Sequence, residues 1–169
     1  MEASDVVLCT PLQQLKDEHV ALRVEMDLFY EIAEEIEFDS GPAVGQLFAK
    51  LYDRISSFTN ALNTHSKREE EGLFPIMSRR LGKDDRTIEG MEFEHEKAEK
   101  HLRDFLTEAD QAGPTIDEND AKAISVYAEQ AYATLTQHFA KEEKMLFPLA
   151  ETILSIDEKN ELEQRFQEP

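Results

Sequence analysis

Two stretches of the chain repeat one pattern and decide its fold: HSKREEEGLFP at residues 65–75 and HFAKEEKMLFP at residues 138–148. Both read H-x-x-x-E-E-x-x-L-F-P. On a helix, residues four apart lie on nearly the same face, so each stretch directs an imidazole and a carboxylate to one place. Nitrogen and oxygen donors at this spacing are typical of a site that chelates a metal.

The repeat extends upstream of these two stretches. A Glu-His pair precedes each copy, as Glu18-His19 before the first and Glu94-His95 before the second. This internal symmetry indicates a duplicated helical hairpin, in which each half supplies two histidines and one glutamate of the motif.

Turn residues divide the chain into four long helices and one short helix. Gly, Pro and capping residues gather at 39–42, 81–85 and 112–117, and such combinations mark helix ends. The predicted helices cover about residues 10–38, 42–80, 85–111 and 117–153, with a short C-terminal helix at about 157–167. The length suits a single domain spanning residues 1–169, whose helical bundle covers about 10–153.

Apolar side chains recur every three or four residues along the long helices, and polar residues interrupt this apolar stripe at six places. These six residues are His19, His65, Glu69, His95, His138 and Glu142. The same spacing places Gly72 and Met145 in the stripe. Burial of an unpaired ionised carboxylate is costly, so Glu69 and Glu142 require compensation, which a divalent metal would provide.

The size of this donor set favours two metal ions over one. Four imidazoles and two carboxylates exceed the roughly four ligands of a tetrahedral zinc ion. They suit two six-coordinate ions bridged by carboxylates, and nitrogen and oxygen donors of this kind favour iron or manganese. Cys9 is the one cysteine of the chain, which excludes an intramolecular disulfide and a thiolate zinc site. We therefore expect two iron ions.

Composition narrows the classes of partner. The chain carries 37 acidic and 18 basic residues, for a net charge of −19, so phosphate backbones and anionic lipid surfaces would be repelled. No apolar run approaches the roughly 18 residues of a membrane span, and the first residues lack the features of a signal peptide. We expect no nucleic-acid partner, no membrane partner and a cytoplasmic location.

The paired motifs, the isolated His19 and the Glu94-His95 pair resemble the hemerythrin-like, HHE cation-binding domain over about residues 10–152. The resemblance implies an all-α, antiparallel up-down-up-down four-helix bundle with a non-haem di-iron centre, carboxylate- and oxo-bridged. In that centre Glu69 and Glu142 would bridge the ions, and the four motif histidines would be terminal ligands. Open positions would then bind oxygen, peroxide or nitric oxide.

Departures from the family pattern refine the expected function. Oxygen-carrying hemerythrins have an H-x-x-x-H pair on the third helix and an aspartate in the fourth-helix motif, where this chain has Glu99 and Glu142. These departures argue against reversible oxygen carriage. The four-His, two-Glu set is more similar to members linked to iron sensing, nitrosative-stress repair or redox signalling, which would act alone or through a separate protein partner.

Two alternatives of other classes stay open on the sequence. A di-iron peroxidase or oxidase would use the same ligands, because open iron sites activate peroxide and oxygen. A metal-free helical interaction module would instead tolerate loss of the buried polar residues. The chain has no phosphate-binding glycine loop and no nucleophile elbow, so the leading interpretation is a metal-binding protein that is not primarily an enzyme.

Several residues near the motifs have more than one possible role. Glu99 is a seventh ligand, an outer partner of a ligand or a solvated residue, and the roles of Glu18 and Glu94 stay open. The periodicity points Glu70 and Glu143 away from the ligand face, where each hydrogen-bonds a neighbouring helix or meets solvent, with the surface favoured. It places His101 at the surface or against a neighbouring helix. Gly72 either lines a pocket or permits close helix packing, with packing favoured.

Overall fold

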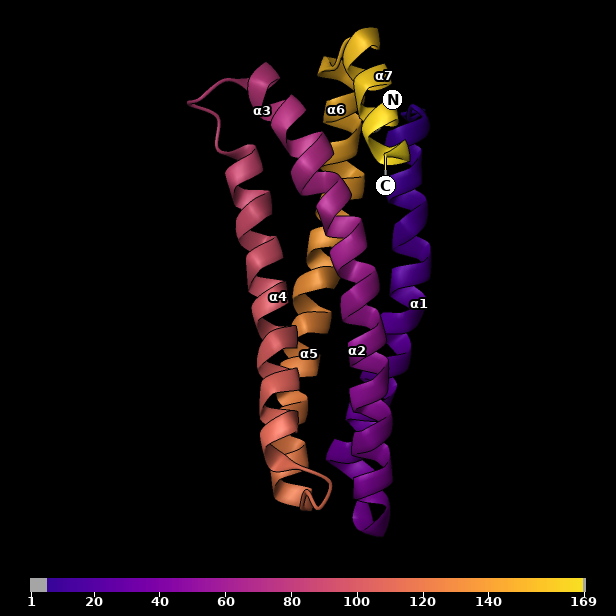
Figure 1. Cartoon of the computed structure of the whole chain (residues 1–169), viewed down its shortest axis with the longest axis vertical. Coiled ribbons are helices and arrows are strands. Elements are labelled where there is room, and N and C mark those ends of the chain that lie inside the picture. Colours follow the sequence, from indigo (N-terminus) through magenta and orange to yellow (C-terminus); the bar gives the residue numbers. More distant parts are fainter. Residues whose placement is uncertain (1–5, 169) are drawn as a thin grey trace. The chain divides into compact units, whose positions relative to one another are not determined.

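The computed structural model describes residues 6–168, which form helices and contain no strand (Figure 1). The expectation of an all-helical chain is confirmed. The elements are α1 (Thr10–Asp39), η2 (Gly41–Ala43), α2 (Val44–Arg68), η3 (Glu69–Leu73), α3 (Phe74–Leu81), α4 (Thr87–Ala112), α5 (Glu118–Lys141), η4 (Glu142–Leu146), α6 (Phe147–Ile153) and α7 (Ile156–Gln167). Of these, η2 is a 3₁₀ turn, whereas η3 and η4 are π-helical turns.

Local chemistry accounts for the helix ends. Gly82 follows α3 with a φ of 91° and Gly113 follows α4 with a φ of 75°, a conformation that glycine adopts without steric cost. Ser155 starts α7 through a capping box, in which its side chain accepts from the Glu158 amide and the Glu158 carboxylate accepts from the Ser155 amide.

Two predicted helices, at about 42–80 and 117–153, each contain a π-helical turn. Pro75 and Pro148 are the second residues of α3 and α6. A proline has no amide hydrogen, and its ring clashes with the carbonyl four residues earlier, so the preceding turn widens. The Phe74 amide accordingly donates to the Glu69 carbonyl, and the Phe147 amide donates to that of Glu142. The prolines therefore widen the two helices at the end of each sequence motif.

The π turn η4 shifts the apolar stripe of its helix by one residue. The prediction that Met145 lies in the stripe is wrong, because its side chain is 42% exposed and Leu146 is fully buried in its place. A π turn holds more residues than an α turn, so the α-helical spacing fails across η4. In α1 and α4, which are α-helical throughout, the residues of the stripe are buried as predicted.

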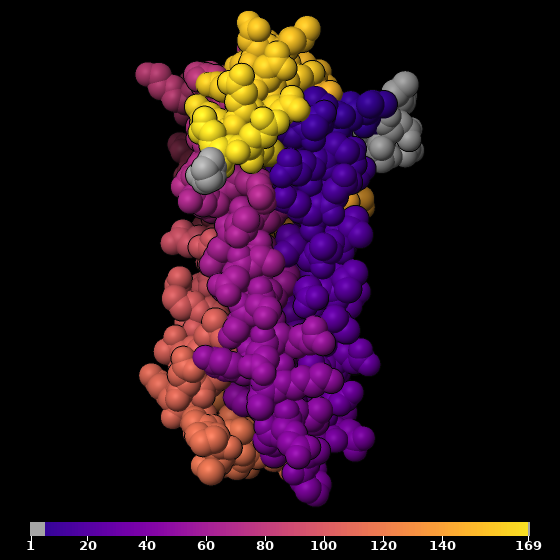
Figure 2. All heavy atoms as spheres, turned by 45° about the vertical axis from the view of Figure 1, so that its right-hand side comes forward, coloured from indigo at the N-terminus to yellow at the C-terminus, as the bar shows by residue number. Residues whose placement is uncertain are grey.

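The chain divides into two compact units, and each long helix contributes to both. Unit 1 contains the chain up to Ala21, Asn63–His95 and the chain from Gln137 onward. Its apolar core includes Leu12, Phe74, Met91 and Phe147. Figure 2 shows the yellow atoms of α7 against the magenta segment around η3, where Phe166 and Leu162 lie beside Gly72.

Unit 2 contains Leu22–Leu62 and Glu96–Thr136. Its interior includes an edge-on pair of phenylalanine rings, Phe29 and Phe58, with centroids 5.1 Å apart. Outside this core, the Tyr52 hydroxyl donates to Asp110 at 2.7 Å. The polar end of this tyrosine is thus hydrogen-bonded, as is usual for amphipathic aromatic side chains.

Candidate metal centre

All six polar residues of the predicted stripe lie in unit 1, and each is at most 4% exposed. His19 comes from α1, His65 from α2, Glu69 from η3, His95 from α4, His138 from α5 and Glu142 from η4. Because η3 continues α2 and η4 continues α5, these six side chains come from four helical segments.

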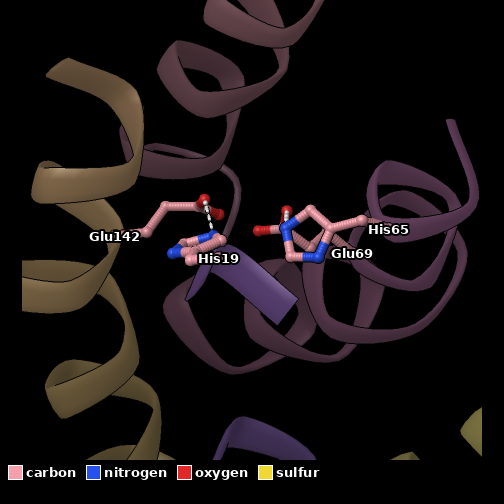
Figure 3. A group of neighbouring side chains, drawn as sticks. All are labelled: His19, His65, Glu69 and Glu142. Carbon is pink, nitrogen blue, oxygen red and sulfur yellow. Dashed lines mark ion pairs between the residues drawn. The ribbon is translucent and has the colours of Figure 1, made fainter. Parts of the chain in front are cut away.

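The six side chains form two overlapping groups. The first consists of His19, His65, Glu69 and Glu142, and the second consists of Glu69, His95, His138 and Glu142. Within each group, one donor atom from every residue lies within 4.8 Å of the others. Figure 3 shows the first group, with both imidazoles and both carboxylates pointing toward one another. The two glutamates are common to both groups.

Glu69 and Glu142, the inner glutamates, each place one carboxylate oxygen between two imidazoles. Glu142 Oε1 is 3.2 Å from Nε2 of His19 and 3.3 Å from Nε2 of His138. Glu69 Oε1 is 2.9 Å from Nε2 of His65 and 3.6 Å from Nε2 of His95. The two halves of the repeat therefore build equivalent arrangements.

These short contacts do not satisfy the buried atoms. Both carboxylate oxygens of Glu69 and of Glu142 lack a hydrogen bond of acceptable geometry, as do the Nε2 atoms of His19, His65 and His138. Buried polar atoms in folded proteins are almost always partnered. An imidazole that carries its proton on Nδ1 presents a lone pair at Nε2, so acceptors face acceptors here. A cation between them would satisfy both kinds of atom, and the site therefore fits a metal.

Four further glutamates bind the outer nitrogens of the histidines. The Nδ1 atoms of His65 and His138 contact Glu18 at 2.7 Å and Glu94 at 2.6 Å, respectively. The Nδ1 atoms of His19 and His95 contact Glu143 at 2.9 Å and Glu70 at 3.0 Å, respectively. An ionised carboxylate only accepts hydrogen bonds, so each Nδ1–H donates.

This outer contact corrects the surface assignment of Glu70 and Glu143. Their side chains are partly exposed, at 42% and 21%, but each carboxylate reaches inward to a buried imidazole. The signal was present in the sequence, because both motifs carry a second glutamate directly after the first. The open question about Glu18 and Glu94 is also answered, since both hold a histidine.

Two cations support the outer shell. Arg68 donates to Glu18 at 2.8 Å and Lys141 donates to Glu94 at 2.7 Å. Burial would raise the pKa of these two carboxyl groups, but the hydrogen bonds from the histidines and the nearby cations outweigh burial and lower both pKa values. Both carboxylates are therefore ionised at neutral pH.

The histidines differ in their electrostatics. Burial is the largest cause that lowers the pKa of His19 and of His138, which keeps both imidazoles neutral and able to bind a metal. Burial also acts to lower the pKa of His65, but Glu18 and Glu69 outweigh it and raise the pKa to about 9. Negative charge around His65 thus attracts a cation, either a proton or a metal ion.

Aromatic side chains line the centre. Phe139 stacks on His19 with ring centroids 4.0 Å apart, Phe74 lies 5.3 Å from His95, and Phe147 lies 5.7 Å from His19. All three phenylalanines are buried. The Leu-Phe-Pro ends of the motifs therefore supply part of the apolar wall of the site, and this wall limits the access of water.

The remaining predicted neighbours lie outside the two groups. Glu99 and His101 belong to unit 2 and to neither group, and burial, followed by the charges of Lys97 and Lys100, lowers the pKa of His101. The space beside Gly72 is occupied, because a Cβ there would lie 3.0 Å from Phe166 Cε1. Close packing is therefore the role that the structure supports for Gly72.

Comparison with known proteins agrees with this architecture. The family model of the hemerythrin HHE cation-binding domain matches residues 10–161. The chain therefore belongs to the hemerythrin HHE cation-binding domain family. No curated protein and no solved structure gives a significant match. None of the helices between residues 6 and 168 combines the length and apolar character that a membrane span requires.

Proposed function

We propose that the chain is a non-haem di-iron protein that binds or senses iron, oxygen or nitric oxide in iron homeostasis or in redox and nitrosative stress. One observation carries the proposal: Glu69 and Glu142 belong to both buried groups of donors, whereas each histidine belongs to one. Two shared carboxylates and two histidines for each ion are the donors of a carboxylate-bridged pair of metal ions.

The charges around the centre support two divalent ions. Six carboxylates contact the four imidazoles, and Arg68 and Lys141 bind two of these carboxylates, Glu18 and Glu94. Carboxylates gathered around neutral imidazoles favour divalent cations at the centre. Nitrogen and carboxylate oxygen donors favour iron or manganese over metals that prefer thiolates, and the family to which the chain belongs binds cations.

The residues of the chain divide the work of such a centre. His19 and His65 would hold one ion, His95 and His138 would hold the other, and the two inner glutamates would contact both. When bound, two irons supply redox chemistry toward oxygen, peroxide or nitric oxide. The buried Phe139 and its aromatic neighbours limit water near the imidazoles, which favours a small, weakly polar ligand.

We also propose the antiparallel up-down-up-down four-helix topology of this family for the chain, within one domain and with α7 as a C-terminal addition. The four helical segments that supply the ligands support this topology. The proposed ligand is a diatomic molecule or peroxide, with a separate protein as redox or signalling partner. The net charge of −19 argues against nucleic acid and anionic membranes as partners.

Metal analysis of protein purified without a chelator tests the proposal, together with the visible spectrum before and after azide is added. We expect about two irons per chain and an absorption band that azide shifts. No stoichiometric metal after anaerobic reconstitution with ferrous iron would overturn the proposal. Stopped-flow mixing of the reduced protein with peroxide separates it from a peroxidase, because a sensor is oxidised once and an enzyme turns over.

A further inference from the structure

We propose that Glu18, Glu70, Glu94 and Glu143 are positioning residues that form a closed ring around the metal centre. Each of these carboxylates holds the histidine of the next long helix, and the last holds the histidine of the first. The inference rests on the proposed metal site and assigns roles to residues outside its ligand set. Their contacts with the imidazoles carry it.

The order of the contacts follows the chain. Glu18 of α1 binds His65 of α2, and Glu70 of η3, which continues α2, binds His95 of α4. The order continues in the second half, where Glu94 of α4 binds His138 of α5, and Glu143 of η4 binds His19 of α1. These contacts all run in one direction, so each ring carboxylate reaches an imidazole that comes from another helical segment.

This arrangement fixes the tautomer of each histidine of the centre in its neutral form. A carboxylate that accepts from Nδ1–H leaves the lone pair on Nε2, and it is the Nε2 atoms that face Glu69 and Glu142. The carboxylate also raises the basicity of the imidazole and fixes the orientation of the ring plane. Each glutamate thus prepares a ligand on a neighbouring helix for the metal.

Half of the ring carboxylates lie in the π turns. Consecutive residues of an α-helix point about 100° apart, yet Glu69 and Glu70 both reach buried imidazoles, as do Glu142 and Glu143. A π turn places more residues in each turn and so reduces this angle. Because η3 and η4 begin at Glu69 and Glu142, each Glu-Glu pair supplies one inner and one outer carboxylate.

The other half of the ring is fixed by cations. Arg68 and Lys141 lie three residues after His65 and His138, and each holds the carboxylate that supports the histidine of its own helix. The cation and the imidazole thus bind the same glutamate from one helix face. The repeated spacing of these residues in the two halves of the chain is the sequence signature of the ring.

Histidine tautomers measured by nitrogen NMR on the zinc-loaded protein test the ring, because zinc is diamagnetic and has no redox chemistry. Glu94→Ala is expected to disturb His138, on another helix, and to leave the adjacent His95 unchanged. Iron affinity, measured by chelator competition, is expected to fall about 10–100-fold. Glu94→Gln should preserve the tautomer with a smaller loss of affinity, because its amide oxygen still accepts. Glu92→Ala, an exposed change on the same helix, is the control.

A second variant protects the test against misfolding. Glu70 is the most exposed of the four side chains in these pairs, at 42%, so Glu70→Ala leaves no buried cavity and is expected to disturb His95 and not His65. Circular dichroism checks that both variants are folded. Wild-type protein that binds metal, with Glu94→Ala and Glu70→Ala indistinguishable from Glu92→Ala, would overturn the ring alone. Wild-type protein that binds no metal would overturn the proposed function and the ring with it.

Discussion

Glu69 and Glu142, one from each copy of the repeated motif, take part together in both groups of buried metal donors. Their carboxylates lie between the imidazoles of all four helical segments, at 2.9–3.6 Å from the Nε2 atoms. Each histidine, in contrast, belongs to one group. Loss of a glutamate and loss of a histidine should therefore have different consequences for metal content.

Metal stoichiometry is expected to separate the two kinds of ligand. Glu142→Ala removes a donor from both groups and should abolish binding of both ions. His19→Ala removes a donor from one group and should retain about one ion per chain. The measurement is metal analysis after anaerobic reconstitution with ferrous iron, with His101→Ala as the control outside the groups. Equal losses in Glu142→Ala and His19→Ala would contradict the shared role of the glutamate.

Replacement of Glu142, which should abolish metal binding, should increase the stability of the metal-free protein. Glu142 is fully buried and both of its oxygens lack a hydrogen bond, so Glu142→Leu is expected to stabilise the metal-free protein by about 1–3 kcal/mol. The same change should remove the rise in melting temperature that ferrous iron gives the wild type, because a ligand stabilises only the state that binds it. Thermal unfolding with and without iron measures both effects. If iron leaves the melting temperature of the wild type unchanged, the result would favour a metal-free interaction module.

The burial of the six candidate ligands was predictable because α-helical spacing holds over most of each helix. His19 and His95 interrupt apolar stripes in segments that stay α-helical, and their burial followed directly from the three-four spacing. The prediction failed at Met145, where the π turn shifts the stripe by one residue. A proline ten residues after each histidine was visible in the sequence, but the conversion of its steric clash into a widened turn depends on the packing of the whole helix.

The outer carboxylates were harder to predict for a tertiary reason. Glu18 neighbours His19 in sequence but binds His65, which lies on another helix. Helical periodicity describes the face on which a residue lies and contains no information about the rotation of the neighbouring helix. In an acidic chain, moreover, glutamates beside histidines are common by composition alone. The repeated Glu-His and Glu-Glu pairs indicated a matched role, and only the fold identified the partners.

Protonation of Glu129 at low pH should stabilise unit 2. Burial, followed by the nearby Glu37 and Glu34, raises the pKa of Glu129 from 4.5 to about 7. The folded state thus favours the protonated form, so the stability from this group is fully present below about 4.5 and is lost as pH rises through about 7. Glu129→Gln is therefore expected to stabilise the protein by about 1 kcal/mol at pH 8, after allowance for solvent screening, and by much less near pH 5.

Urea unfolding of Glu129→Gln and wild type at the two pH values measures this difference directly. Glu35→Gln serves as a matched control, because Glu35 is exposed and lies between Glu34 and Glu37 in α1. Comparison between variants at each pH removes the contribution of the other carboxylates. A gain in stability that is equal at pH 5 and pH 8 would contradict the assignment to Glu129 ionisation.

Gly72 is expected to be a packing residue for α7 and not part of a route for ligands. A side chain at this position would meet Phe166 Cε1 at 3.0 Å and Leu162 Cδ1 at 3.2 Å from its Cβ. Gly72→Leu should therefore displace α7 and destabilise the protein by about 1–3 kcal/mol, with faster proteolysis near the C-terminus. The same change at Gly90, where a Cβ meets nothing within 4 Å, is the control and should be neutral or slightly stabilising.

The displaced α7 also loses a specific hydrogen bond in this prediction. Arg165 Nη1 donates at 2.9 Å to the carbonyl of Glu71, which lies four residues before Pro75 and so cannot receive the usual helical amide hydrogen. Azide affinity of the iron-loaded protein distinguishes the two roles of Gly72. Unchanged azide affinity in Gly72→Leu, together with lower stability, is the expected result. Weaker azide binding with α7 still resistant to proteolysis would instead place Gly72 on the path of the ligand.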